Sequence, residues 1–267
     1  MPHRETDSPY RVQVLDRALG LLDALAQQPN GATLTELSLR LRLHKSTAHR
    51  LVMVLERHHL VCRQPETGRY RLGLKLFELG SRAVASTDLR EQARPHLQRV
   101  LYETEETVHL CVLDEGEVVY VDKVEPQRSV RMASSMGRRM PAHCTAVGKA
   151  MLAELSETEV DEIVRRSGLR RVTRHTITTP AELSAELRAI RARGYALDNE
   201  ENEEGVRCVA AAVRDSNGHP VAAISVSGPS FRITKEKVPV VARAVTAAAQ
   251  AISQKLGHRG GRSVSAS

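Results

Sequence analysis

The sequence predicts an α+β protein with an amino-terminal winged helix-turn-helix and a larger second domain built on a mainly antiparallel sheet. Three observations lead to this prediction. The apolar period changes from 3.6 to 2 near residue 60, basic residues concentrate in residues 40–75, and strand and helix patterns alternate beyond residue 88. With 267 residues, 41% of them apolar, the chain can bury one large core or two smaller ones.

Three amphipathic helices are expected first. They span residues 12–28, 34–41 and 45–58. Asn30-Gly31 is a stop signal after the first helix. Thr33 and Glu36 fit a capping box at the start of the second, because the Thr33 hydroxyl can accept the Glu36 amide and the Glu36 carboxylate can accept the Thr33 amide.

A hairpin follows the third helix. The expected strands are residues 60–64 and 69–72, and Pro65 to Gly68 form a turn signature between them. We expect one face to carry apolar side chains, namely Val61, Tyr70 and Leu72. We expect the other face to carry Arg63, Arg69 and Arg71. The order helix, helix, turn, helix, hairpin is that of a winged helix-turn-helix.

Positive charge is concentrated in this first domain. Residues 1–87 carry 13 Lys or Arg against 8 Asp or Glu, and residues 40–75 carry nine against two, an excess that equals the net +7 of the whole chain. A solvated basic face would explain the charge alone, but the helix and hairpin order favours duplex DNA as the partner. With two Phe, five Tyr and no Trp, the chain has few platforms for stacking unpaired bases.

The third helix and the hairpin supply the candidate DNA contacts. A recognition helix needs polar donors near its start and phosphate contacts around it. The candidates for base edges are Ser46, Thr47, His49 and Arg50. The candidates for phosphates are Lys45, Arg57, Arg63, Arg69 and Arg71.

One helix is expected on each side of the boundary between the domains. Residues 74–84 fit either an ordinary core helix or a linker that carries a signal and helps dimerisation, and the sequence leaves both open. Ser86-Thr87-Asp88 is the expected break. Pro95 lies inside the next helix, residues 89–105, and is expected to kink or restart it.

The second domain mixes both periods. The expected strands are residues 107–113, 118–124, 129–134, 196–199, 206–215 and 221–227. The expected helices are residues 145–154, 157–166, 181–193 and 234–256. The Gly, Ser and Arg after residue 257 predict a disordered tail.

Sequence patterns in this domain argue against catalysis. Gly148-Lys149 lacks the upstream Gly and the following Ser or Thr of a phosphate loop, because positions 143 and 150 are His and Ala. Adjacent residues such as His143 and Cys144 point apart, which disfavours a thiol nucleophile. A metal could gather Cys111, His143, Cys144 and Cys208, but no ligand spacing supports it and buried core cysteines are the simpler interpretation.

A small-molecule pocket is the remaining signal. The loop of residues 136–150 leads into a helix whose free amides could attract an anion. Residues 198–204 hold five acids, one of which could turn inward, and Cys208, Ser225 and Ser227 lie on neighbouring strands. The alternative is a polar end of the sheet that binds no ligand.

Several of these stretches resemble the isocitrate-lyase-regulator (IclR) family of bacterial transcription factors. The matching stretches are residues 17–22 (RALGLL), 45–51 (KSTAHRL), 70–73 (YRLG), 141–150 (PAHCTAVGKA), 198–201 (DNEE), 205–208 (GVRC), 223–229 (AISVSGP) and Arg232. They occur in collinear order over about residues 10–256, so several independent motifs agree.

The resemblance implies a DNA-binding domain over residues 10–73, a linker helix over 74–87, a GAF-like effector domain over 88–256 and a tail over 257–267. It implies homodimers or homotetramers that bind partly palindromic operators and control catabolic genes in response to small carboxylate or aromatic metabolites. By position, the effector pocket would comprise Met132, Met140, Ala146, Val147, Asp198, Val206, Cys208, Ser225 and Ser227.

We therefore expect an effector-responsive, sequence-specific regulator that is not an enzyme. The polar, acid-containing start is not a signal peptide, no apolar run is long enough to span a bilayer, and four cysteines are too few for a disulfide scaffold. These features predict a soluble cytoplasmic protein without cofactor or metal. The alternatives are a metabolite-binding protein or enzyme with an incidental basic hairpin, and a repressor that needs no ligand. The effector, the operator and the sign of regulation stay open.

Overall fold

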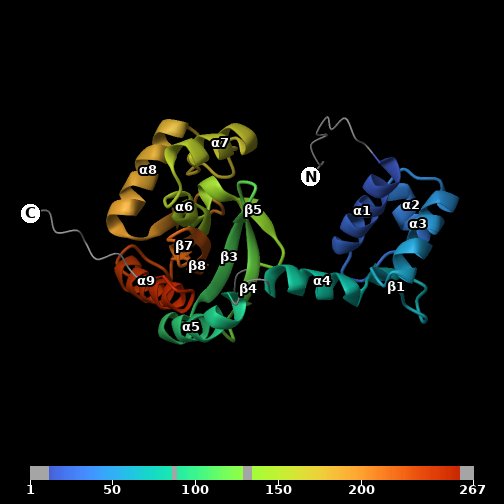
Figure 1. Ribbon diagram of the computed structural model, residues 1–267, viewed down its shortest axis with the longest axis horizontal. Coiled ribbons are helices and arrows are strands. Elements are labelled where there is room, and N and C mark those ends of the chain that lie inside the picture. Colours follow the sequence, from blue (N-terminus) through green and yellow to red (C-terminus); the bar gives the residue numbers. More distant parts are fainter. Residues whose placement is uncertain (1–11, 86–88, 129–133, 259–267) are drawn as a thin grey trace, which may run out of the picture. The chain divides into compact units, whose positions relative to one another are not determined.

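The computed structural model describes residues 12–85, 89–128 and 134–258. The chain divides into two compact units, residues 1–86 and 87–267, and helix α4 groups with the first (Figure 1). Three predictions fall on residues that the structure does not describe: the strand at 129–134 except for Ser134, the pocket residue Met132, and the tail beyond His258. His258 itself lies against the sheet unit, with its Nδ1 atom 3.2 Å from the carbonyl oxygen of Asp215.

The first unit has the predicted winged helix-turn-helix order. Its elements are α1 (Gln13–Ala26), α2 (Leu34–Arg40), α3 (Lys45–Arg57), β1 (Val61–Arg63), β2 (Tyr70–Leu72) and α4 (Leu74–Ala85). The capping box is present: the Glu36 amide donates to Thr33 Oγ1 at 3.2 Å, and the Thr33 amide donates to Glu36 Oε2 at 2.7 Å. Thus α2 begins where the sequence predicts.

The core of this unit is formed by the apolar stripes of three helices and the hairpin. The residues buried together are Leu21, Leu25, Leu37, Leu51, Val52, Leu55, Val61 and Tyr70. The hairpin is anchored to the helices by an extra bridge, in which Ala32 and Tyr70 exchange backbone hydrogen bonds of 2.9 and 2.7 Å. This bridge fixes the hairpin relative to the loop before α2.

The expected facing of the hairpin residues was wrong for Arg63. In the β1–β2 register Arg63 lies opposite Tyr70, and its guanidinium carbon is 5.9 Å from the Tyr70 ring centroid. Residues two apart on a strand share a face, so Arg63 lies on the same face as Val61. Leu72 lies opposite Val61 and therefore on the expected face, where its side chain is 39% exposed.

In the described part of the second unit, six strands form one sheet with the order β5-β4-β3-β8-β7-β6, in which all neighbours are antiparallel. The strands are β3 (Thr107–Asp114), β4 (Glu117–Val124), β5 (Arg139–Pro141), β6 (Ala196–Asn199), β7 (Val206–Arg214) and β8 (Pro220–Pro229). A short 3-10 turn, η1 (Ala142–Cys144), leads from the edge strand β5 into the helical layer.

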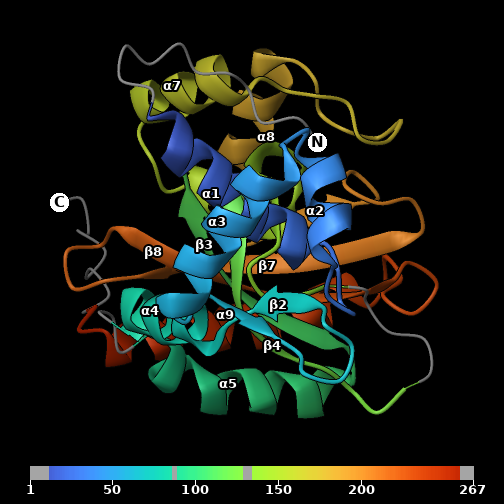
Figure 2. The ribbon, with the colours of Figure 1, turned by 90° about the vertical axis from the view of Figure 1, so that its right-hand side faces the viewer.

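Helices cover both faces of this sheet. They are α5 (Leu89–Thr104), α6 (Ala146–Leu152), α7 (Glu157–Ser167), α8 (Pro180–Arg193) and α9 (Val238–Lys255). Figure 2 shows β7 and β8 running between α7 and α8 above and α5 and α9 below. The core on the α6 side joins Val147, Met151 and Leu187 to Ala210 and Ala223 of the sheet. The fold is therefore α+β, as predicted.

One local prediction differs from the structure. The segment expected to be a loop before α6 contains β5, which pairs with Glu117 to Val119 of β4. Three residues are too few to show a period of 2, so periodicity could not reveal this strand. Helix α5 continues through Pro95, so it is not restarted there, and the alternative, a kink at Pro95, stays a prediction. Among the described helices, none is long and apolar enough to cross a membrane.

Candidate functional site

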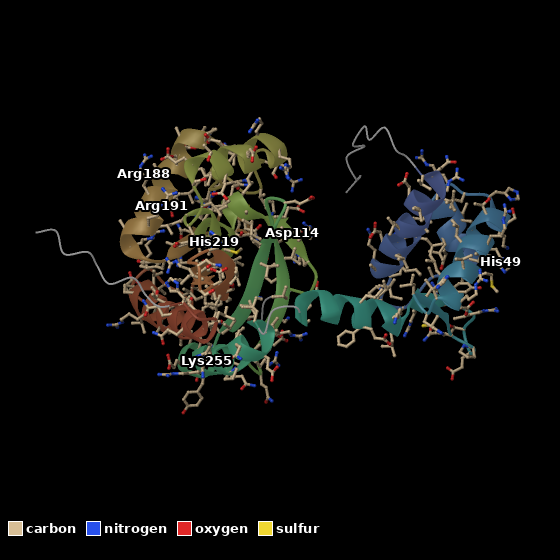
Figure 3. The ribbon with its side chains drawn as sticks, in the orientation of Figure 1. His49, Asp114, Arg188, Arg191, His219 and Lys255 are labelled. Atoms are coloured by element: carbon tan, nitrogen blue, oxygen red, sulfur yellow. The ribbon has the colours of Figure 1, made fainter. Side chains whose placement is uncertain are left out.

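The first candidate site is the outer face of α3. His44 caps this helix: its Nδ1 accepts the Ser46 amide at 3.4 Å and lies 2.8 Å from the Ser46 hydroxyl oxygen. Because Ala48, Leu51, Val52 and Leu55 are buried, the opposite side faces solvent. It presents Lys45, Ser46, His49, Arg50 and Arg57 as exposed side chains and Thr47 as a half-buried one. Figure 3 shows His49 pointing outward from the helix.

The three arginines of the hairpin are not equivalent. The Nε and Nη2 atoms of Arg69 donate to the carbonyl oxygen of Gly31 at 3.1 and 3.0 Å, and Nη2 donates to Glu36 Oε2 at 2.9 Å. Arg71 is half-buried, and its Nε has no partner among the described residues. Arg63 is exposed beside Tyr70. The guanidinium of Arg69 therefore already ties the hairpin to the start of α2.

The second candidate site is a cavity of about 40 Å³ in the second unit. Residues from β3 to β8 and from the first turn of α6 line it. Eight of the nine predicted pocket residues line it, namely Met140, Ala146, Val147, Asp198, Val206, Cys208, Ser225 and Ser227. The lining also includes residues that were not predicted, namely His109, Tyr120, Ser134, Arg138, Thr145, Asn202 and Glu203.

His109 is the most enclosed basic group of the cavity wall. Its Nε2 lies 2.7 Å from Ser134 Oγ, its Nδ1 lies 3.4 Å from Ser227 Oγ, and its ring meets Tyr120 edge-on at 4.9 Å. Burial, with the charge of Lys123, lowers the pKa of His109 to about 3. The imidazole is therefore neutral at physiological pH, and both ring nitrogens have hydroxyl neighbours.

Asp198 is the buried acid of the cavity. It is 2% exposed, and its Oδ1 accepts the amides of Glu201 at 2.8 Å and Asn202 at 3.4 Å. Burial raises the pKa of Asp198 to about 7, assisted by the carboxylate of Glu201 and opposed by Lys149. Near neutral pH this carboxyl group can thus either donate or accept a hydrogen bond.

A fully buried lysine lies behind the cavity wall. Lys149 of α6 is 0% exposed, and its Nζ lies 2.5 Å from Glu201 Oε1 and 3.9 Å from Glu186 Oε1. The second oxygen of Glu201 is buried without a hydrogen-bond partner in the described residues. Two buried carboxylates, Asp198 and Glu201, therefore lie close to one buried ammonium group. The ion pair between Lys149 and Glu201 holds the loop that follows β6 against α6.

The cysteines and the Gly148-Lys149 dipeptide have structural explanations. The Cys144 sulfur lies 3.9 Å from Asn202 Oδ1, burial raises the thiol pKa to about 12, and the neighbouring His143 instead uses Nε2 to meet the Arg170 carbonyl at 3.1 Å. A Cβ at Gly148 would lie 2.2 Å from a backbone oxygen of η1, so only glycine allows α6 to approach that closely. Among the described residues, no three His, Cys, Asp or Glu side chains are grouped to hold a metal.

A winged helix-turn-helix unit and a separate α+β unit with a polar cavity define the class of helix-turn-helix transcriptional regulators. Residues 14–65 match the "IclR helix-turn-helix domain", and residues 81–254 match "Bacterial transcriptional regulator IclR C-terminal". The chain belongs to the IclR family of bacterial transcriptional regulators.

Individual relatives match almost the whole chain. The HTH-type transcriptional regulator KdgR of Dickeya chrysanthemi is 37% identical over 250 residues, which are 94% of this chain and 82% of KdgR. The crystal structure of Thermotoga maritima IclR superposes with a TM-score of 0.80 at 38% identity, covering 93% of this chain and 100% of that one. An IclR homologue from Microbacterium hydrocarbonoxydans, complexed with 4-hydroxybenzoate, gives a TM-score of 0.81 at 27% identity, covering 91% of this chain and 98% of that one.

Proposed function

We propose that this regulator inserts α3 into the major groove of operator DNA and that a small metabolite in the cavity of the second unit controls the binding. The observation that carries the proposal is the two-sided character of α3. One side is buried, and the other presents a serine hydroxyl, an imidazole and guanidinium groups. Such donors can hydrogen-bond base edges in the major groove, and the arginines can contact phosphates.

Mobility-shift titrations at several salt concentrations test the DNA contact. Arg50→Ala is expected to cost about 1–3 kcal/mol on a preferred sequence and to relax base preference. Arg57→Ala is expected to weaken binding to all duplexes alike and to reduce the salt slope by about 1. Arg188→Ala is the matched control, because this exposed arginine lies on α8 of the other unit. The docking is wrong if Arg50→Ala and Arg57→Ala bind like the control.

Homo-oligomer formation is part of the proposal, because paired half-sites require paired recognition helices. Apolar side chains of α1 and α4 support it: Leu15 and Leu19 lie one turn apart and are 58% and 60% exposed, and Leu74 and Phe77 of α4 are 81% and 65% exposed. A single chain leaves these surfaces in water. Sedimentation of Leu15→Glu/Leu19→Glu is expected to show a smaller assembly than that of the parent. An unchanged assembly would mean that α1 is not an interface.

The effector is proposed to be a small carboxylate, with or without an aromatic ring. Arg138 and the hydroxyls of Ser225 and Ser227 offer donors to a carboxylate, while Tyr120 and Met140 offer apolar surface. The Microbacterium relative with 4-hydroxybenzoate supports an acid of this size. Calorimetry with a carboxylate panel on the parent and on Ser227→Ala tests the cavity. Operator DNA must then change the affinity for the effector by the same factor as the effector changes the affinity for DNA. Helix α4 would connect the two units in this coupling.

The remaining part of the proposal is that the protein regulates transcription and catalyses no reaction. Because the bacterial chromosome lies in the cytoplasm, we also propose that the protein is cytoplasmic. The raised pKa of the Cys144 thiol and the engagement of His143 with a backbone carbonyl oppose a thiol-nucleophile mechanism. Turnover of any ligand that calorimetry detects would contradict this part. Product analysis by mass spectrometry after overnight incubation with the protein is the measurement.

A further inference from the structure

An arginine-rich segment lies in the second unit, outside both sites described above. Residues 165–175 contain five arginines and a histidine and no acid. They run from the last turn of α7 into its connection with α8, the olive and yellow part of Figure 1. The basic side chains are all exposed, and they are Arg165, Arg166, Arg170, Arg171, Arg174 and His175. This segment is called the α7–α8 basic segment below.

The backbone of the basic segment is held in place by hydrogen bonds of two threonine hydroxyls. Thr176 is 5% exposed; its hydroxyl accepts the amides of Val172 and Thr173 at 3.0 and 2.8 Å and donates to the Glu201 carbonyl at 2.7 Å. Thr173 Oγ1 donates to the Glu200 carbonyl at 2.7 Å. The segment is thus preorganised, which lowers the entropic cost of binding a partner through its side chains.

Three acids face the segment. Glu162 lies 3.9 Å from Arg165 and Glu204 lies 3.8 Å from Arg174, and all four side chains are more than 60% exposed. The charges of Arg174 and His175 also act on the carboxylate of Glu200. Exposed ion pairs contribute little and compete weakly with a stronger anion. The five arginines of residues 165–175, with no acid among them, therefore attract negative charge.

The chemistry of the segment favours phosphate over a protein surface. It contains no aromatic residue, and its apolar side chains are Leu169, which is half-buried, and Val172, which is 38% exposed. Protein interfaces depend on buried aromatic and apolar anchors, whereas protein–DNA interfaces are polar and strongly positive. Guanidinium groups also suit the paired oxygens of phosphates.

We propose that the α7–α8 basic segment is a second phosphate-binding surface, which contacts the backbone of duplex DNA flanking the operator. The inference rests on the proposed DNA-binding function and adds a contact made by the effector unit itself. The segment also touches the loop that lines the cavity, because Glu201 precedes the cavity residues Asn202 and Glu203. Flanking DNA and the effector would therefore act on the same loop.

The test uses the full chain and fluorescence anisotropy on duplexes of about 20 and about 60 base pairs, titrated at several salt concentrations. The variant is Arg170→Ala/Arg171→Ala/Arg174→Ala. The matched control, Arg99→Ala/Arg188→Ala/Arg243→Ala, removes the same charge from exposed positions elsewhere on the second unit. Thermal unfolding establishes that both variants fold like the parent.

On the long duplex the segment variant is expected to lose about 2–3 from the slope of log affinity against log salt, since each lost phosphate contact removes about 0.9. The control is expected to keep the parent slope, and Arg170→Lys/Arg171→Lys/Arg174→Lys is expected to retain most of it. On the short duplex, the segment variant is expected to approach the parent. Equal losses in variant and control, or no loss in the variant, overturn the inference, and an acidic protein then becomes the better partner for the segment.

The two proposals fail separately. If the parent binds no duplex even at low salt, the proposed function fails. If Arg57→Ala lowers the slope while the segment variant does not, the proposed function stands and only the second surface is lost.

Discussion

Lys149→Met is expected to destabilise the second unit strongly. The ammonium group of Lys149 is fully buried, and its nearest partner is Glu201 Oε1 at 2.5 Å. Methionine fills a similar volume but carries no charge, so the substitution leaves Glu201 buried beside a thioether with one oxygen already lacking a partner. Removal of one member of a buried ion pair costs about 3–5 kcal/mol. A unit of this size loses roughly 2–4 °C per kcal/mol, which predicts a fall in Tm of about 6–20 °C.

Circular dichroism during heating measures this fall, and pH gives it a signature. Burial already raises the pKa of Glu201, and Lys149 opposes that rise. Without Lys149 the pKa rises further, so the protonated carboxyl is favoured in the folded state. Stability is then retained at low pH and lost as pH rises through the folded pKa, so the penalty is expected to be larger at pH 8 than at pH 5. Lys255→Met, at an exposed position of α9, is the control.

The double variant Lys149→Met/Glu201→Gln provides the decisive comparison. With neither charge present, no buried ion lacks a partner, so most of the lost stability is expected to return. A double variant as unstable as Lys149→Met would refute the reasoning, since the loss would then come from packing. A fall of less than about 2 °C in the single variant would refute it as well.

Three further predictions concern single residues. Asp198→Asn is expected to stabilise the second unit relative to the parent by up to about 4 kcal/mol as pH rises from about 4 to about 7. The reason is that the folded pKa of Asp198, about 7, exceeds the ordinary 3.8, so ionisation of the buried carboxyl opposes folding. Urea unfolding across pH measures the difference in unfolding free energy, and a difference that does not change with pH would contradict the prediction. Arg69→Ala is expected to cost the first unit about 1–2 kcal/mol through the lost bonds to Gly31 while leaving the DNA salt slope unchanged; a smaller slope at unchanged Tm would instead identify a phosphate contact. Gly148→Ala is expected to cost about 1–3 kcal/mol of unfolding free energy, because the added methyl group would clash with the backbone of Ala142. Gly80→Ala, whose methyl group would have no neighbour within 4 Å, is expected not to destabilise the first unit. Equal Tm values for the two variants would refute this prediction.

The fold could be predicted where a local pattern is long enough to be unambiguous. Helices α1 to α3 follow from apolar residues at helical spacing, and the start of α2 follows from Thr33 and Glu36. Strand β5 could not be predicted, because its three residues depend on pairing with β4 rather than on their own pattern. The wrong prediction for Arg63 had a different cause. Alternation along the strand already places residues 61 and 63 on one face, so the sequence alone could have shown that Arg63 shares a face with Val61.

The candidate sites show the same division between local and long-range information. The polar positions of α3 follow from helix geometry alone. The engagement of Arg69 depends on a carbonyl 38 residues away, which no local pattern indicates. His109 had a weak signal, as a polar residue inside an apolar strand, but only the register with Ser225 and the reach of Ser134 bring it to the cavity. Cys208, Ser225 and Ser227 followed from the strand pattern and Asp198 from its acidic stretch, whereas Met140 and Val206 were implied by the resemblance alone.

The size of the cavity has a mechanical consequence. At about 40 Å³ it has room for only a few water molecules, whereas an engineered cavity of about 150 Å³ binds benzene. The aromatic acid proposed above as an effector would therefore have to push the walls apart. The work of that expansion is subtracted from affinity, but it also couples binding of the metabolite to displacement of protein atoms, and a regulator that signals by changing shape requires such displacement.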